Sequence, residues 1–328
     1  MDGMTDSLPA RPAAPRFAWR QALAGLAVAA ALALPFVVQG FYLFQVTLAM
    51  TYAIALLGLN ILVGYSGQIS LGHGAFFAVG AYTAAILADG FGAPLWAGVP
   101  AAAALCFVIG FAFGLPALRL EGHYLALATF ALAVAVPQLL KWKALEHWTG
   151  GVQGILLAKP EAPAWIPLSQ DQWLYLMVLA VTAIAFAAAR NFLDGRLGRA
   201  LVAIREHSVA ATAMGVDVAG VKTLTFGISA LYTGAAGALS AAVVQFVSPD
   251  TFNFFLSITL VIGVVVGGLG RVSGALYGAA FIQFVPNIVD QVSKSATWAI
   301  YGMLLIVVVF TMPQGISGLV GRLLRRRP

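Results

Sequence analysis

The sequence predicts an all-α polytopic membrane protein with about ten transmembrane helices. Hydrophobic residues make up 61% of the 328 residues and charged residues only 9%, whereas soluble domains carry roughly 25% charged residues. Apolar runs close to the length of a membrane-spanning helix recur along the chain. A membrane β-barrel would instead show segments of about ten residues with alternating polarity. Composition and run length therefore both favour a helical membrane fold.

The predicted helices follow the apolar runs in chain order. Most runs approach the roughly 20 residues that cross about 30 Å of hydrocarbon. The run at 74–88 is shorter, and the Gly/Ser-rich stretch before it can continue into the membrane. The runs lie at 21–38, 41–63, 74–88, 94–117, 123–140, 172–189, 223–247, 253–269, 273–290 and 297–312.

Basic residues orient these predicted spans. Arginines precede the first run and follow the last one, and positive charge marks the cytoplasmic side of a membrane protein. Both termini are therefore expected in the cytoplasm, which requires an even number of spans. The same alternation places Arg119, the 190–222 loop and Arg271 inside, and only lysines (Lys141, Lys143, Lys159, Lys294) outside.

The domain organisation follows from this topology. We expect a single transmembrane domain between two cytoplasmic tails, the first disordered and the last basic. One long loop is expected on the cytoplasmic side and another on the periplasmic side. The ranges are 1–20 for the first tail, 21–315 for the domain, 191–222 for the cytoplasmic loop, 142–171 for the periplasmic loop and 316–328 for the basic tail.

Several function classes lack the residues they need. No charged residue lies in the interior of a predicted span, since Asp290 stands at the end of its run, and proton-driven carriers usually need one in the interior. No lysine follows glycine as in a nucleotide-binding P-loop. One cysteine and four scattered histidines predict no metal site, and basic residues at span ends do not indicate nucleic acid. Ser70 and His73 lie close together, but the G-x-S-x-G pattern of a hydrolase is absent.

The stretch from Gly195 to Lys222 is a long polar interruption between apolar runs. Apolar residues recur in it at roughly helical spacing, and Gly215 is well placed to end a helix. These features predict a short amphipathic helix outside the bilayer, a docking element for a cytoplasmic partner. The alternative is a basic loop that only fixes topology.

A seven-residue pattern, G-x-x-G-x-x-S, occurs at Gly64–Ser70 and again at Gly267–Ser273. Both copies lie between two predicted spans, and transporter folds often carry internal repeats with broken helices. The alternative is chance similarity between Gly-rich turns. The candidate pathway or helix-break residues are Gly64, Gly67, Gln68, Ser70, Gly72, His73, Gly267, Gly268, Gly270 and Ser273.

The long outer loop contains several tryptophans and the turn-like sequence WTGGVQG. Interfacial tryptophans ordinarily form an aromatic belt. Loops of this length are often functional, so Trp148, Gly150 and Gly151 are candidates for contact with an external protein.

Four segments resemble the permeases of branched-chain amino-acid ABC transporters, in particular the LivM-type subunit. They are GLNILVGYSGQISLGHGAFFAVGAYTAAIL (58–87), LEGHYLALATF (120–130) with its continuation WTGGVQGI (148–155), the whole Gly195–Lys222 stretch, and VVVGGLGRVSGALYGAA (264–280). They occur in this order and are spread along the chain between about residues 40 and 290.

The resemblance implies half of an importer in the bacterial inner membrane. A second, LivH-like permease, two ATP-binding subunits and a periplasmic substrate-binding protein would complete it. ATP would bind the ATPase subunits, so this chain would hold no cofactor. The implied ATPase-coupling residues are Arg199, Ile204, Arg205, Glu206, Ala210, Ala211 and Gly215. Val209 replaces the glutamate of the wider coupling pattern, which leaves the detailed contact open.

The resemblance leaves the substrate open among branched-chain amino acids, urea, short amides and aromatic acids. The path without mid-membrane charge suits a zwitterion or a neutral solute. A self-contained secondary carrier or channel is the alternative of another class, and it would need no docking helix for an ATPase.

Overall fold

The computed structural model describes residues 18–118, 120, 122–163, 167–292 and 297–325. Its longer helices are α1 (Ala18–Val37), α2 (Phe41–Asn60), α3 (His73–Phe91), α4 (Leu95–Ala117), α5 (His123–Leu140), α7 (Gln170–Asp194), α10 (Val218–Val244), α11 (Phe254–Gly267), α12 (Val272–Val292) and α13 (Thr297–Thr311). The shorter helices are α6 (Glu146–Thr149), α8 (Arg196–Glu206), α9 (Ser208–Ala213) and α14 (Gly315–Arg325).

Each of the ten apolar runs contains a helix, but fewer helices meet the requirements for a span. Among the described residues, seven are long and apolar enough to cross a membrane. An eighth span results if α13 and α14, which meet at a 48° bend, are one broken span. The described apolar part of α1 and the 14-residue α11 are too short. The predicted number of about ten spans is therefore not confirmed.

Helix α10 lies at the centre of the bundle. It is the most buried of the candidate spans, and it packs against α2, α3 and α4. A Cβ atom at Gly80 would overlap the carbonyl oxygen of Gly234, and one at Gly237 would overlap that of Phe77. Small residues at these positions let α3 and α10 approach backbone to backbone, which is how helices associate tightly in lipid.

A second group of helices packs on the other side of α2. Helices α11 and α12 pack against each other and against α2. A buried polar cluster joins α2 to α12, because the side-chain amide of Gln283 donates to Gln45, and Asn287 also reaches Gln45 at 3.4 Å. Gln283 therefore joins two packed helices through a hydrogen bond.

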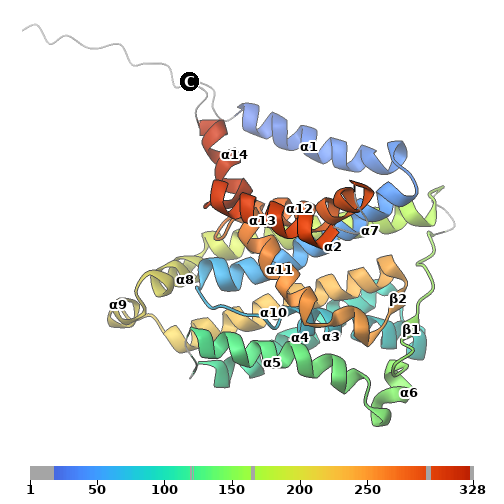
Figure 1. Cartoon of the computed structure of the whole chain (residues 1–328), viewed down its shortest axis with the longest axis horizontal. Coiled ribbons are helices and arrows are strands. Elements are labelled where there is room, and N and C mark those ends of the chain that lie inside the picture. The colour runs from blue at the N-terminus through green and yellow to red at the C-terminus, as the bar shows by residue number, and fades with distance from the viewer. Residues whose placement is uncertain (1–17, 119, 121, 164–166, 293–296, 326–328) are drawn as a thin grey trace, which may run out of the picture.

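The bundle has two distinct ends (Figure 1). Helices α8 and α9 lie at one end, named here the α8 end, and α6 lies at the opposite end, named here the outer end after the topology that the sequence predicts. The predicted disordered tail 1–20 falls outside the described residues up to residue 17, and Ala18 begins α1. The predicted basic tail 316–328 is helical as far as Arg325, since α14 packs against α11 and α12.

The all-α prediction misses a small sheet at the outer end. Strand β1 (Ile155–Leu156) pairs antiparallel with β2 (Phe246–Val247), and Ile155 lies opposite Val247. Gly154 makes the pairing possible, because its φ is 76° and a Cβ there would overlap the carbonyl oxygen of Val247. Two-residue strands have no detectable periodicity, so the sequence pattern does not reveal them.

We predict that Gly80→Leu lowers the free energy of unfolding by about 3 kcal/mol or more, because overpacking against a backbone cannot relax through side-chain rotation. The thermal midpoint of the detergent-purified protein measures the effect. Gly90→Leu on the same helix is the matched control, since no atom lies within 4 Å of a Cβ there. Equal midpoints for the two variants would contradict the packing role of Gly80.

Candidate functional site

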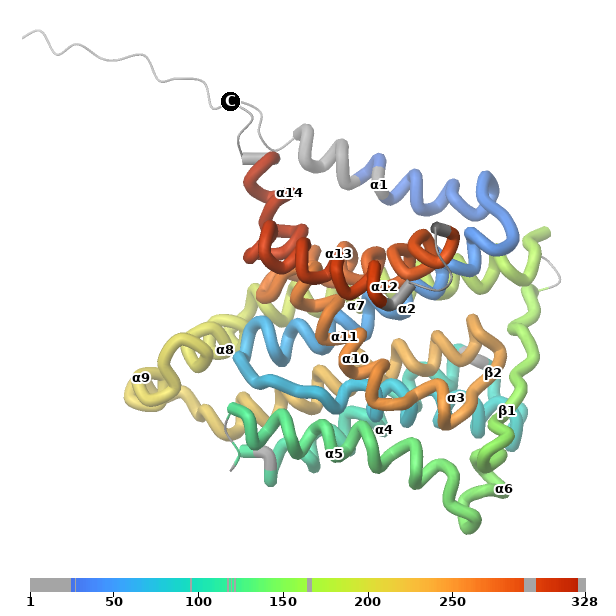
Figure 2. Tube along the Cα trace, viewed as in Figure 1, coloured from blue at the N-terminus to red at the C-terminus, as the bar shows by residue number. Residues whose placement is uncertain are grey.

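An extended segment, residues 66–72, connects the end of α2 to α3. Helix α2 continues as the π-helical turn η1 (Ile61–Tyr65), after which Gly67 turns the chain with a φ of 73°. The Leu71 N–H then donates to Thr129 Oγ1 of α5 at 2.9 Å. Thr129 lies six residues into α5, or about 9 Å along its axis. The segment therefore re-enters the bundle, and Figure 2 shows it as the uncoiled stretch between α2 and α3.

His73, the first residue of α3, holds that helix to α2 and α10. The Ser229 hydroxyl donates to the Gly58 carbonyl oxygen at 2.6 Å, so Ser229 Oγ must accept from His73 Nε2, also at 2.6 Å. His73 Nδ1 then accepts from the Ser70 hydroxyl at 2.9 Å. In a neutral imidazole this arrangement places the proton on Nε2. Both partners of His73 are side-chain hydroxyls, so the residue joins the start of α3 to the residue 66–72 segment and to α10.

The two G-x-x-G-x-x-S stretches contact each other. The buried Asn60 side chain donates to the Arg271 carbonyl oxygen at 2.8 Å and accepts from the Gly270 N–H at 2.9 Å. A Cβ at Gly64 would lie 2.5 Å from the Gly270 nitrogen. The sequence pattern thus identified two breaks that meet in space, which chance similarity between turns does not predict.

The two stretches differ in their serines and in their neighbours. Ser70 is fully buried, whereas Ser273 is exposed on the first turn of α12. Gly267 packs against Gly274, and Gly268, with a φ of 118°, leaves room for the Ser317 side chain of α14. The second break is therefore a tight turn between packed helices, without the long re-entrant course of the first.

The predicted cytoplasmic helix is divided into α8 and α9. His207 breaks it with a φ of −157°, and its Nδ1 accepts from the Ala210 N–H at 3.3 Å as the N-cap of α9. The prediction of one amphipathic helix was wrong at this point. Leu201 and Ile204 of α8 are buried against the bundle, so Ile204 is a packing residue of this chain rather than an exposed contact.

Arg205 connects α8 to both breaks. Its Nη1 donates to the Gly64 carbonyl oxygen. Its side-chain stem covers Gly67, where a Cβ would lie 3.2 Å from Arg205 Cγ. A Cβ at Gly270 would lie 3.3 Å from Arg205 Nη1. Movement of α8 would therefore act on both Gly-rich stretches through a single side chain.

Helix α9 presents an apolar surface away from the bundle. Val209 is 72% exposed and Met214 is 85% exposed. Gly215, at a φ of 83°, ends the helix, because its N–H bonds to Thr212 and the Val216 N–H reaches the Ala211 carbonyl at 3.0 Å. This is the Schellman arrangement that favours glycine, and it confirms the predicted helix stop.

The remaining predicted coupling residues divide between the outside and the interior. Arg199, Glu206 and Ala210 are exposed, as is Gly215, whereas Ala211 is buried. Arg199 donates to the Asp194 carbonyl oxygen at 3.1 Å. The sequence pattern did not single out Val209 and Met214, which are the most exposed large apolar side chains between Gly195 and Lys222, although their hydrophobicity within a polar stretch was a usable signal.

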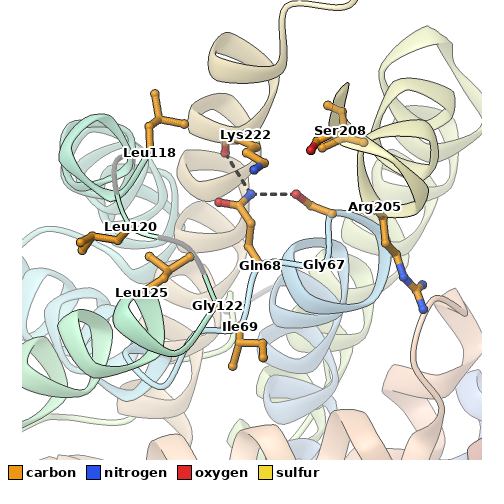
Figure 3. Close-up of a pocket in the computed structure, with 12 residues that line it drawn as sticks. Gly67, Gln68, Ile69, Leu118, Leu120, Gly122, Leu125, Arg205, Ser208 and Lys222 are labelled. Carbon is orange, nitrogen blue, oxygen red and sulfur yellow. Dashed lines mark hydrogen bonds between the residues drawn. The ribbon is translucent and has the colours of Figure 1, made fainter. Parts of the chain in front are cut away.

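A cavity of about 230 Å³ opens beside the extended segment at the α8 end. Figure 3 shows Gln68 and Ile69 pointing in opposite directions from this segment. The Gln68 amide donates to Ser66 Oγ at 2.7 Å and to the Lys222 carbonyl oxygen at 3.4 Å. Leu118 and Leu125 line the other side. Sequence reasoning did not predict the cavity, because its walls come from segments far apart in the chain.

The three residues predicted to contact an external protein, Trp148, Gly150 and Gly151, lie at a turn. Trp148 is about half exposed and stacks on Phe91 with ring centroids 6.1 Å apart. Gly150 and Gly151 both have positive φ, and Gly151 is buried. Of the three, only Trp148 offers a large exposed side chain. The neighbouring Val152, which was not predicted, is 65% exposed.

We predict that Asn60→Ala lowers the free energy of unfolding by about 2 kcal/mol, because the Gly270 N–H and the Arg271 carbonyl lose their buried partner. The thermal midpoint in detergent measures the change. The control is Asn191→Ala, which removes an exposed amide on α7 and should leave the midpoint unchanged. A wild-type midpoint for Asn60→Ala would refute its role as a clamp.

Comparison with known proteins gives the family. No solved structure matches the chain. The chain is 32% identical to the high-affinity branched-chain amino acid transport system permease protein LivM of Escherichia coli K12, over 87% of this chain and 72% of that protein. It is 26% identical to the corresponding protein LivH of Salmonella typhimurium, over 83% of this chain and 93% of that protein.

The same description applies to a third relative and to the family as a whole. The permease protein BraD of Pseudomonas aeruginosa is 25% identical over 83% of this chain and 93% of its own length. The model of the family described as branched-chain amino acid transport system / permease component matches residues 41–312. This range includes both breaks, α8 and α9, so the chain belongs to the branched-chain amino acid transport permease family.

Proposed function

We propose that this chain is the transmembrane permease subunit of an ATP-driven ABC importer for branched-chain or related amino acids in the bacterial inner membrane. It pairs with a second permease, two ATP-binding subunits and a periplasmic substrate-binding protein. One observation carries the proposal: the exposed apolar helix α9 follows α8 after a single residue, and Arg205 of α8 lies against both Gly-rich breaks.

Helix α9 has the character of a docking element. Val209 and Met214 project apolar surface from a short, capped helix. A helix that lays such side chains into a groove is a common mode of protein recognition. In the proposed assembly the groove belongs to an ATP-binding subunit, and ATP stays on that subunit.

Arg205 connects the proposed docking helix α9, through α8, to the transmembrane domain. When the ATP-binding subunits move α9, α8 moves with it, and the guanidinium displaces the Gly64 carbonyl. The Asn60 clamp transfers that displacement to the turn at Gly270 and Arg271. The two breaks would then shift together, which is the two-state behaviour that alternating access requires.

Branched-chain amino acids are the favoured cargo because the relatives' names specify them. Urea, short amides and aromatic acids are the alternatives. Residues 66–72 carry no charged side chain, so recognition along this segment relies on hydrogen bonds and apolar contacts.

We predict that Val209→Glu with Met214→Glu removes the ATP-binding subunits from the complex, because a charged surface does not enter an apolar groove. Affinity purification from detergent-solubilised membranes, followed by identification of the co-purifying chains, tests this. Val152→Glu at the outer end is the control, and it should retain the ATP-binding subunits.

Two outcomes would contradict the proposal. Retention of the ATP-binding subunits by the double variant would show that α9 is not the dock. Purification of the wild-type chain without any ATP-binding subunit, with transport intact, would identify a self-contained carrier.

We predict that Arg205→Met keeps the ATP-binding subunits bound but lowers amino-acid uptake at least tenfold, because the link from α8 to Gly64 is lost. Uptake into proteoliposomes and ATP hydrolysis are measured on the same preparation. Arg196→Met, at an exposed position on the first turn of α8, is the control and should transport normally. Normal uptake by Arg205→Met would rule out this route of coupling.

A further inference from the structure

A second segment without α-helix enters the bundle from the outer end. It follows β2 and contains the 3₁₀ turn η3 (Pro249–Phe252) and Asn253. Asp250 forms an ion pair with Lys141 at the outer end of α5. Four residues later, the Phe254 ring packs against Phe130 near the middle of α5, with ring centroids 5.7 Å apart. Phe130 lies eleven residues before Lys141, or about 16 Å along the helix.

The two re-entrant segments reach the same level of α5. Leu71 bonds to Thr129, and Phe254 packs on the next residue, Phe130. The helices that follow them are also joined, because the Gly74 N–H of α3 donates to Ser257 Oγ of α11 at 2.9 Å. Helices α3 and α11 therefore both begin within the bundle, beside the middle of α5.

Part of this irregular backbone lies on the surface. Ile69 is 46% exposed, and Thr251 and Asn253 are exposed polar residues between the outer end and mid-depth. Within the described part of the chain, the N–H groups of Gly67 and Ile69 have no hydrogen-bond acceptor. Hydrocarbon offers no acceptor either, and irregular backbone at membrane depth is tolerated only against protein or a water-filled cavity.

Helix α11 covers only part of this face. It begins beside the middle of α5, and its 14 residues extend about 21 Å toward the α8 end. Phe255 and Ile258 near its start point outward and are 62% and 37% exposed. The outer half of the face is therefore formed by the irregular residues 249–253 instead of a helix, which suits a protein neighbour better than lipid.

We propose that the face formed by α5, residues 66–72 and 249–253, and α11 is covered by the second permease. Figure 1 shows α5 and α11 on the side of the bundle nearest the viewer. The occupant is a homologous permease because this chain is similar to proteins of two permease names, LivM and LivH. The inference rests on the proposed function and adds the location of the interface.

Site-specific photo-crosslinking in the co-expressed complex tests the location. The photoreactive amino acid p-benzoylphenylalanine replaces Phe255 on α11 or Leu127 on α5, which are 62% and 63% exposed. Matched controls carry it at Ile184 on α7 or Val108 on α4, which are 68% and 61% exposed. After irradiation, adducts are separated by mass and identified by peptide sequencing.

The proposal expects adducts with the second permease at Phe255 and Leu127, at least tenfold more abundant than at Ile184 and Val108. Three results would overturn the proposal: adducts at Phe255 and Leu127 with lipid alone, adducts there with a second copy of this chain, or adducts with the second permease at Ile184 or Val108 instead. If any of these three results is found while the ATP-binding subunits and the second permease co-purify, the proposed function stands and only the interface is wrong. If no second permease co-purifies, the proposed function itself fails.

Discussion

The side-chain amide of Asn60 holds together the α8 end of the molecule. It bonds to the N–H of Gly270 and the carbonyl of Arg271, two backbone groups that a helix would otherwise have satisfied. Arg271 in turn donates to the Ser317 carbonyl of α14 at 2.9 Å. In a membrane protein every interruption of a helix leaves such groups, so the breaks exist only where side chains such as Asn60, Thr129 and Ser257 complete them.

Two kinds of packing divide the fold. Around α10, glycines bring backbones into direct contact, and such contacts leave little room for one helix to slide past another. At the α8 end, close glycine contacts such as Gly64 with Gly270 are accompanied by hydrogen bonds from single side chains, and such hydrogen bonds can be exchanged at modest cost. In the proposed transporter, this end could therefore change its hydrogen bonds while the centre around α10 stays packed.

The sequence predicted the helical membrane class, the two Gly-rich breaks and the stop at Gly215, because these depend on composition and on local backbone geometry. It did not predict the break at His207, since histidine is an unusual N-cap and the apolar spacing continues past it. The span number is not confirmed at α11, because the apolar run 253–269 includes residues that are not helical. The burial of Ile204 and Ala211 depends on neighbours from distant segments of the chain. In the transmembrane helices, which are apolar on all sides, periodicity does not reveal which side of a helix faces the interior of the bundle.

The pairing of β1 with β2 has a consequence for biogenesis. Ile155 and Val247 lie opposite each other, yet α7, α8, α9 and α10 must all be made between them. During synthesis the first strand therefore waits, with its edge unpaired, until the last helix of that group has been inserted. The two strands can therefore pair only after α10 has been made, so the sheet is one of the late contacts of the fold.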